Sequence, residues 1–152
     1  MLLVTLIAGL VAATGPPSAS APTAVRPCLL LGDSIAIGIA RLRPACRLVA
    51  QKGITSDEVL AAAPADRSYR HVIVAMGSND RWRTPLPRNL AAVRTLYPKA
   101  SFTWIAPRRG RSAQQVAAFA SSHHDGLVEL VDFSSRDTVH PLDYAAVAAR
   151  LP

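Results

Sequence analysis

Four short segments of the chain carry side chains suited to acyl-transfer chemistry. Ser34 offers a hydroxyl nucleophile, and His140 offers a base with a carboxylate, Asp137, three residues before it. One turn of chain can bring that carboxylate to Nδ1 of the imidazole, which leaves Nε2 to take the serine proton. The backbone N–H of Gly53 and the side-chain amide of Asn79 are candidate donors to a developing oxyanion. Together these residues make up the parts of a serine hydrolase.

Each of these residues also has an ordinary structural interpretation. Ser34 can be the N-cap of a helix, Asn79 can form an Asx-turn, and Gly53 can be a loop glycine. Asp137 and His140 can be a surface acid and a helix-capping histidine. The catalytic interpretation is therefore the better one only in a fold that brings all four segments together.

Short apolar runs alternate with amphipathic segments along the chain. This alternation predicts βαβ units and a doubly wound parallel sheet with helices on both faces. The expected strands span 28–31, 47–51, 71–76, 101–106 and 127–131, and the expected helices span 34–42, 55–63, 87–97, 112–121 and 141–151. The second helix begins with a sequence that resembles a capping box, and the last has proline at its first turn. Each chemical motif follows a predicted strand, so all of them are expected at the carboxyl edge of the sheet, where ligands bind.

The order and spacing of the motifs resemble those of the SGNH (GDSL-type) family of serine hydrolases. The family's first block is similar to Gly32-Asp33-Ser34-Ile35 and its second-block glycine to Gly53; the last two blocks are similar to residues 77–80 and 137–140. The resemblance implies a three-layer α/β/α flavodoxin-like fold with a five-stranded parallel sheet. It implies a Ser34–His140–Asp137 triad and an oxyanion hole from Ser34, Gly53 and Asn79. It also implies cleavage of esters or thioesters without a metal or a cofactor.

The N-terminal segment has the character of an export signal. Residues 2–13 are an apolar run, followed by a stretch rich in Pro, Ser and Ala. The run is shorter than the roughly 20 residues of a membrane span, so it predicts a signal peptide over 1–21, cleaved after Ala21. No basic residue precedes Arg26, which leaves cleavage after Ala13, or an uncleaved tether, as alternatives. Residues 22–152 are predicted to form a single SGNH hydrolase domain, periplasmic or secreted.

The chain has two cysteines, Cys28 and Cys46. An even count in an exported chain suggests a disulfide. Cys28 begins the first predicted strand and Cys46 precedes the second, so neighbouring parallel strands would place both at one edge. Two buried free thiols are the alternative, and the spacing does not suit a metal site.

The net charge is +7, with fifteen Arg and two Lys. No zinc-finger spacing or RNA-binding aromatic motif accompanies this charge, so no nucleic-acid partner is expected. Arginines cluster after the Asn79 block and after the fourth predicted strand, where they would favour an anionic substrate. The candidate substrate-binding residues are Asp33, Arg81, Trp82, Arg83, Arg108 and Arg109. Trp82 can stack on a sugar ring, and a solvated loop is the alternative.

These features favour a monomeric esterase that cleaves short-chain acyl or O-acetyl esters. The basic loops suggest a substrate that is anionic or carbohydrate-linked, such as acidic polysaccharide or peptidoglycan. A lysophospholipase or acyl thioesterase is the second hypothesis, although the chain is too short to carry a lid for long acyl chains. The third hypothesis is a non-catalytic binding protein that keeps the fold.

Overall fold

Five strands form one parallel sheet at the centre of the protein. The computed structural model describes residues 26–152, so the predicted signal peptide at 1–21 lies outside the described residues. The strand order is β2-β1-β3-β4-β5, and every neighbouring pair is parallel. The strands are β1 (Arg26–Gly32), β2 (Cys46–Ala50), β3 (Tyr69–Ala75), β4 (Ser101–Ala106) and β5 (Gly126–Glu129). The predicted five-stranded parallel sheet is therefore confirmed.

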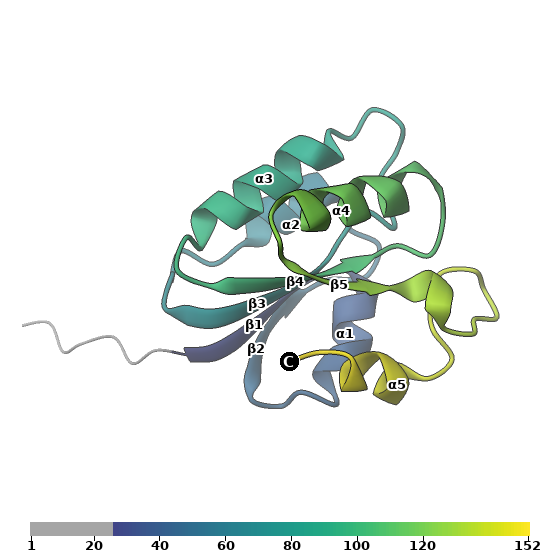
Figure 1. Cartoon of the computed structure of the whole chain (residues 1–152), viewed down its shortest axis with the longest axis horizontal. Coiled ribbons are helices and arrows are strands. Elements are labelled where there is room, and N and C mark those ends of the chain that lie inside the picture. Colours follow the sequence, from purple (N-terminus) through teal and green to yellow (C-terminus); the bar gives the residue numbers. More distant parts are fainter. Residues whose placement is uncertain (1–25) are drawn as a thin grey trace, which may run out of the picture.

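Helices cover both faces of the sheet, which gives the expected three layers. The helices are α1 (Ser34–Ala40), α2 (Ser56–Ala62), α3 (Leu86–Leu96), α4 (Gly110–Ser122), α5 (Tyr144–Ala149) and the short 3₁₀ helix η1 (Leu130–Asp132). Figure 1 shows α2, α3 and α4 on one face of the sheet and α1 and α5 on the other. Because helices cover both faces of the central strands, the buried segment 72–75 of β3 is continuously apolar instead of alternating.

Alternate side chains of each strand enter two separate cores. Leu29, Leu31 and Val74 point toward α2, α3 and α4, where Trp104 is the largest fully buried side chain. Leu30, Ile73, Ile105 and Val128 point toward α1 and α5 on the opposite face. The period of two along a strand assigns neighbouring residues to opposite faces, so both helical layers are anchored by the same strands.

Two elements near the C-terminus differ from the sequence prediction. The fifth strand ends at Glu129, and the chain continues as η1 instead of extending to Val131. The last helix begins at Tyr144 and not at Pro141, because Pro141 pairs with Ser135 in an isolated antiparallel bridge. Asp143 caps that helix, its carboxylate accepting hydrogen bonds from the first free backbone N–H groups.

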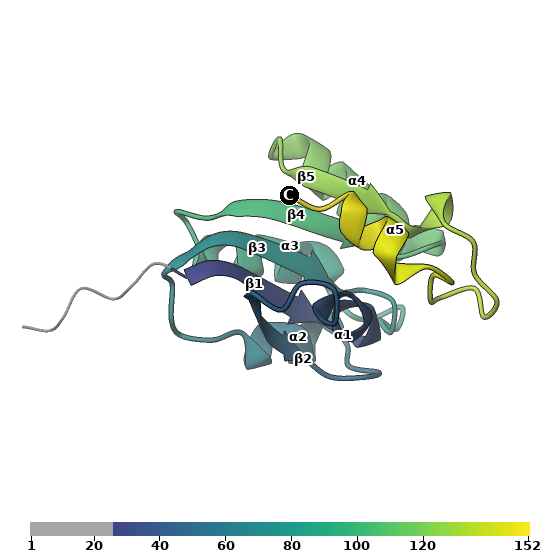
Figure 2. The same ribbon diagram turned by 90° about the horizontal axis from the view of Figure 1, so that it is seen from below.

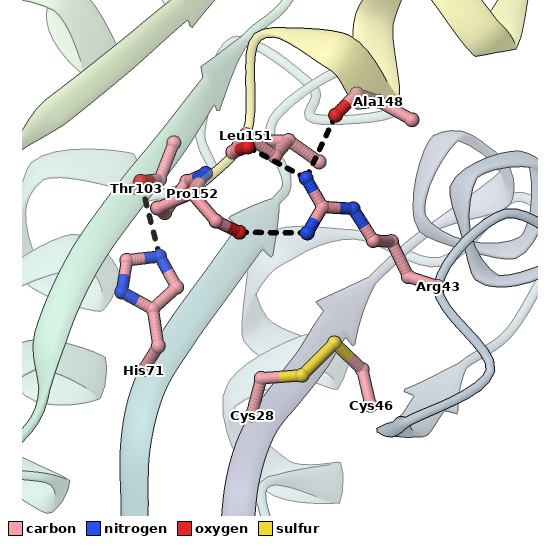
Figure 3. The surroundings of a disulfide bond; sticks show 8 residues. All are labelled: Cys28, Arg43, Cys46, His71, Thr103, Ala148, Leu151 and Pro152. Atoms are coloured by element: carbon pink, nitrogen blue, oxygen red, sulfur yellow. Dashed lines mark hydrogen bonds between the residues drawn. A yellow bond between two sulfur atoms is a disulfide. The ribbon is translucent and has the colours of Figure 1, made fainter.

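A disulfide joins the amino-terminal parts of β1 and β2, which confirms the predicted pairing of Cys28 with Cys46. The two residues lie opposite each other in the strand register, with Cα atoms 4.6 Å apart. Figure 3 shows Arg43, in the loop before β2, reaching to the end of α5. There its guanidinium donates hydrogen bonds to the carbonyls of Ala148, Leu151 and Pro152. This loop therefore holds the C-terminal helix against the sheet.

Candidate active site

The loops that carry the chemical motifs meet at one end of the sheet. Because all five strands are parallel, their carboxyl ends share a single edge. Figure 2 shows the strand arrows pointing toward that edge, with the loops beyond β3 and β5 on the same side. The topology therefore brings together segments separated by up to a hundred residues.

The position of Ser34 depends on the two residues before it. Gly32 ends β1 with a φ of +155°, and a Cβ there would lie 2.0 Å from the carbonyl oxygen of Ala75. Only glycine fits this close approach between two strands. Asp33 is the N-cap of α1, and its Oδ1 accepts a hydrogen bond of 2.9 Å from the N–H of Ile35. Ser34 is therefore not the cap but the first helical residue, and its hydroxyl is free for other partners.

A chain of hydrogen bonds links Ser34 to His140 and Asp137. Ser34 Oγ lies 2.8 Å from His140 Nε2, and His140 Nδ1 lies 2.6 Å from Asp137 Oδ2. An ionised carboxylate can only accept, so Nδ1 carries the ring proton and Nε2 is left as the acceptor for the serine hydroxyl. This is the hydrogen-bonded order of a nucleophile, a base and an orienting acid.

Asp137 is fixed by the turn that also positions His140. Its Oδ1 accepts hydrogen bonds from the backbone N–H groups of Val139, at 3.0 Å, and His140, at 2.7 Å. Thr138, between Asp137 and Val139, has a φ of +65°, which bends the chain back around the carboxylate. The hydrogen bond from the His140 ring, followed by these backbone bonds, holds the pKa of Asp137 well below its ordinary value. The acid therefore stays ionised at neutral pH and into the acid range, and its exposure to solvent favours the same form.

The two candidate oxyanion donors lie on neighbouring loops. Gly53 is exposed with a φ of +75°, and a Cβ there would have no atom within 4 Å. The Nδ2 group of Asn79 donates to the carbonyl of Ile54 at 3.1 Å and to Asp33 Oδ2 at 3.3 Å. Since both hydrogens of the amide have partners, Asn79 can serve an oxyanion only by sharing or exchanging one of these bonds.

A partly buried polar network ties the Asn79 loop to the loop of Gly53. Both carboxylate oxygens of Asp80 accept hydrogen bonds of 2.7 Å from Ser56, one from its N–H and one from its hydroxyl. Asn89 donates to Ser56 Oγ at 2.8 Å and to Asp57 at 2.9 Å. Asp80 thus satisfies the N–H of Ser56 at the start of α2, beside the local capping box of Thr55 and Glu58. This network could not be predicted from the sequence, although Asp80 lies within a recognised motif.

The predicted substrate-binding residues divide into two groups. Arg81, Trp82, Arg83 and Arg109 line a cleft of about 580 Å³ that begins at Gly77 and Ser78, next to Asn79. Asp33 and Arg108 do not line it.

Asp33 and Arg108 have structural contacts instead. Asp33 is fully buried, and burial raises the pKa of its carboxyl group above the ordinary value. The guanidinium of Arg108 donates to the backbone carbonyls of Leu130 and Phe133, which braces η1. These contacts favour a structural role for Asp33 and Arg108 over the predicted substrate contact.

No side chains in the described part of the chain suggest a metal centre or a membrane span. Residues 26–152 contain no group of three His, Cys, Asp or Glu side chains placed to hold a metal ion. No helix within these residues has the length and apolar character needed to cross a bilayer. Two of the other three histidines have structural partners: His71 bonds to Ser101 and Thr103, and His123 contacts the carbonyl of Phe119.

Solved structures of other proteins have a fold similar to that of this chain. A candidate acylhydrolase from Bacteroides fragilis NCTC 9343 is 14% identical with a TM-score of 0.60, and the match covers 85% of each chain. This solved structure and the present chain share a fold. An acetyl xylan esterase (Est2A) from Butyrivibrio proteoclasticus is 14% identical with a TM-score of 0.52, over 88% of this chain and 64% of that one. The peptidoglycan O-acetyltransferase A (OatA) C-terminal catalytic domain from Streptococcus pneumoniae is 13% identical with a TM-score of 0.50, over 83% of this chain and 86% of that one.

By sequence, no protein-family model and no curated protein matches the chain. At 13–14% identity the structural likeness carries the fold, and the chemistry has to be argued from the residues of this chain.

Proposed function

We propose that this protein hydrolyses carboxylic esters with Ser34 as the nucleophile, His140 as the general base and Asp137 as the orienting acid. The observation that carries the proposal is the Ser34–His140–Asp137 hydrogen-bond chain, with distances of 2.8 and 2.6 Å. It lies at the carboxyl edge of a sheet whose fold is shared with proteins described as an acylhydrolase, an acetyl esterase and an O-acetyltransferase.

The proposed reaction has two halves. His140 Nε2 takes the proton of Ser34 as Oγ attacks the ester carbonyl, and the Ser34 and Gly53 N–H groups and the Asn79 amide receive the oxyanion. The alcohol leaves with the proton from His140. A water molecule then gives a proton to His140 and attacks the acyl-enzyme, which releases the acid and restores Ser34. No step calls for a metal or a cofactor.

Short acyl groups are the substrates that the surroundings of Ser34 favour. The side chains of Asp137 and His140 are 55% and 41% exposed, so the triad is open to water and to a bulky alcohol. The cleft beside it is lined largely by polar and charged side chains, which offer little to a long hydrocarbon chain. We therefore place acetyl or similarly short esters of a carbohydrate ahead of lysophospholipids and long-chain thioesters.

The disulfide supports an exported enzyme, because such bonds persist in oxidising compartments and are rare in the cytosol. The predicted signal peptide over residues 1–21 is consistent with export. All three proposed triad residues belong to one chain, which supports a monomer as the active unit.

Hydrolysis of p-nitrophenyl acetate, butyrate and decanoate tests this proposal. Wild type is expected to cleave the short esters best, and Ser34→Ala to lose the activity while keeping the wild-type circular dichroism spectrum. A fluorophosphonate probe is expected to label wild type and not Ser34→Ala. A folded wild type that cleaves none of the three esters and takes up no probe would leave the non-catalytic binding protein as the better hypothesis. Preference for decanoate would favour the lysophospholipase or thioesterase.

A further inference from the structure

Four arginines surround the cleft beside the proposed triad without a matching set of acids. Arg81 and Arg83 come from the loop between β3 and α3, and Arg109 and Arg111 come from the start of α4. In the part of the chain that the structure describes, none of their guanidinium groups forms an ion pair. The one carboxylate in the lining belongs to Asp80, and Ser56 occupies both of its oxygens.

This arrangement leaves an excess of positive charge in a concave site. Charges of one sign that line a cleft focus the electrostatic potential, so an anion that enters gains more than at a flat surface. The guanidinium fork also matches the geometry of a carboxylate or phosphate better than a lysine ammonium does. The helix dipole of α4 has the same sign, since its first residues, Gly110 to Ser112, also line the cleft. The focused potential, the guanidinium geometry and the helix dipole each favour a negatively charged ligand.

Trp82 adds a flat apolar surface to the same cleft. Its side chain is 80% exposed, and the guanidinium of Arg83 lies 4.5 Å from the centre of its ring. An exposed indole can pack against the apolar face of a sugar ring, and the adjacent arginines suit an acidic substituent on such a ring. The combination indicates a charged sugar in preference to a free inorganic anion.

The position of the cleft indicates which half of the ester would bind in it. The cleft is lined by Gly77 and Ser78, which precede the proposed oxyanion donor Asn79, and Ser78 hydrogen-bonds Asp33, the residue before Ser34. This connection relates the cleft to the proposed triad. A polar, arginine-rich lining suits the alcohol half of an ester more than an acyl chain. We propose that Arg81, Arg83, Arg109 and Arg111, together with Trp82, bind an acidic sugar on the alcohol side of the ester. The assignment to the alcohol side rests on the proposed function, whereas binding of the acidic sugar does not.

Binding can be measured separately from catalysis. Isothermal titration of the Ser34→Ala protein with trigalacturonate, maltotriose and inorganic phosphate is expected to show binding of the acidic sugar, weakened by added salt. Maltotriose lacks the carboxylates and phosphate lacks the sugar, so both are expected to bind at least about tenfold more weakly. Equal affinity for trigalacturonate and maltotriose, or for trigalacturonate and phosphate, would overturn the proposal.

A pair of double variants tests the site itself. In the Ser34→Ala background, Arg83→Gln with Arg109→Gln is expected to weaken trigalacturonate binding about tenfold or more. Arg41→Gln with Arg70→Gln removes the same charge from exposed positions outside the cleft, and is expected to change binding less than about twofold. Equal losses in the two double variants would mean a response to net charge alone, and the inference would fail.

Steady-state kinetics then test whether the cleft binds the alcohol side of the ester. With Ser34 intact, the KM for O-acetylated trigalacturonate is expected to rise about tenfold in the Arg83/Arg109 double variant and less than about twofold in the Arg41/Arg70 double variant. Unchanged KM values with intact p-nitrophenyl acetate hydrolysis would overturn the inference alone. If no ester is cleaved but trigalacturonate binds through the cleft arginines, the proposed function fails and the acidic-sugar site remains.

Discussion

Replacing Asp137 by Asn probes the proposed triad with the smallest change of shape. The backbone bonds from Val139 and His140 go to Oδ1, which an asparagine keeps. The changed atom is Oδ2, which accepts from His140 Nδ1 at 2.6 Å and would become an NH2 group. Two donors cannot face each other, so the imidazole would have to move its proton to Nε2. In that tautomer Nε2 points a hydrogen at Ser34 Oγ and can no longer take the serine proton.

The expected loss is large because the tautomer and not the geometry is changed. In serine proteases with a Ser-His-Asp triad the corresponding substitution lowers kcat by about 10⁴-fold. We expect a similar loss of kcat/KM for p-nitrophenyl acetate at neutral pH. Asp137→Ala is expected to lose less, because the exposed position lets water replace the carboxylate and permits either tautomer. The ¹⁵N shifts of the His140 ring report the tautomer directly, and the far-ultraviolet circular dichroism serves as the folding control.

One result would refute this reasoning. If Asp137→Asn retains kcat/KM within about tenfold of wild type, then Asp137 does not set the tautomer of a catalytic His140. An Asp137→Asn protein whose ring proton stays on Nδ1 and which is nevertheless inactive would equally contradict the mechanism, since the base would be competent. Loss of structure in the Asn variant would move the test to Asp137→Glu, which keeps the charge and lengthens the reach.

The remaining predictions concern stability. Because the folded-state pKa of Asp137 is depressed, the stability that its ionised form contributes is full above pH 3.8 and declines as the pH falls below that value. The free energies of unfolding of wild type and Asp137→Asn should therefore converge as the pH is lowered. Gly32→Ala would drive a Cβ into the carbonyl of Ala75 and is expected to cost about 3 kcal/mol in urea unfolding, against about 1 kcal/mol for Gly110→Ala, which meets no atom within 4 Å. Reduction of the disulfide is expected to lower the free energy of unfolding by about 3 kcal/mol, since its loop spans 18 residues; an unchanged midpoint would contradict this.

The sheet and the motif positions could be predicted because their signals are local. The apolar segments at 72–75 and 104–106 lie in β3 and β4, and these strands match the prediction to within two residues. Each motif comes after a strand in the chain, so a parallel topology places the motifs toward one edge. The helix start at residues 55–58 was equally local, and Glu58 indeed accepts from the N–H of Thr55 at 2.7 Å.

The features that could not be predicted depend on distant partners. Pro141 is a favourable residue for the first turn of a helix, yet its pairing with Ser135 delays the helix by three residues. In the sequence Arg108 stands among other arginines, but its guanidinium donates a hydrogen bond to the carbonyl of Leu130 in η1, 22 residues later. Asn89 gave no signal at all, because its partner Ser56 lies 33 residues earlier on another helix. In each case a tertiary contact decided between local alternatives.

The hydrogen bonds between loops explain how three separate segments can form one oxyanion site. The amide of Asn79 bonds to the carbonyl of Ile54, so the donor from the loop after β3 is held directly against the loop that carries Gly53. Asp80 fixes the same two loops a second time through Ser56. Positions set by such mutual contacts do not depend on a substrate to order them, so an oxyanion at the proposed site would require only the sharing or exchange of an Asn79 hydrogen bond. This arrangement also accounts for a polar network in an otherwise apolar layer: its buried groups are fully bonded, and the bonds run between the loops whose relative position matters most.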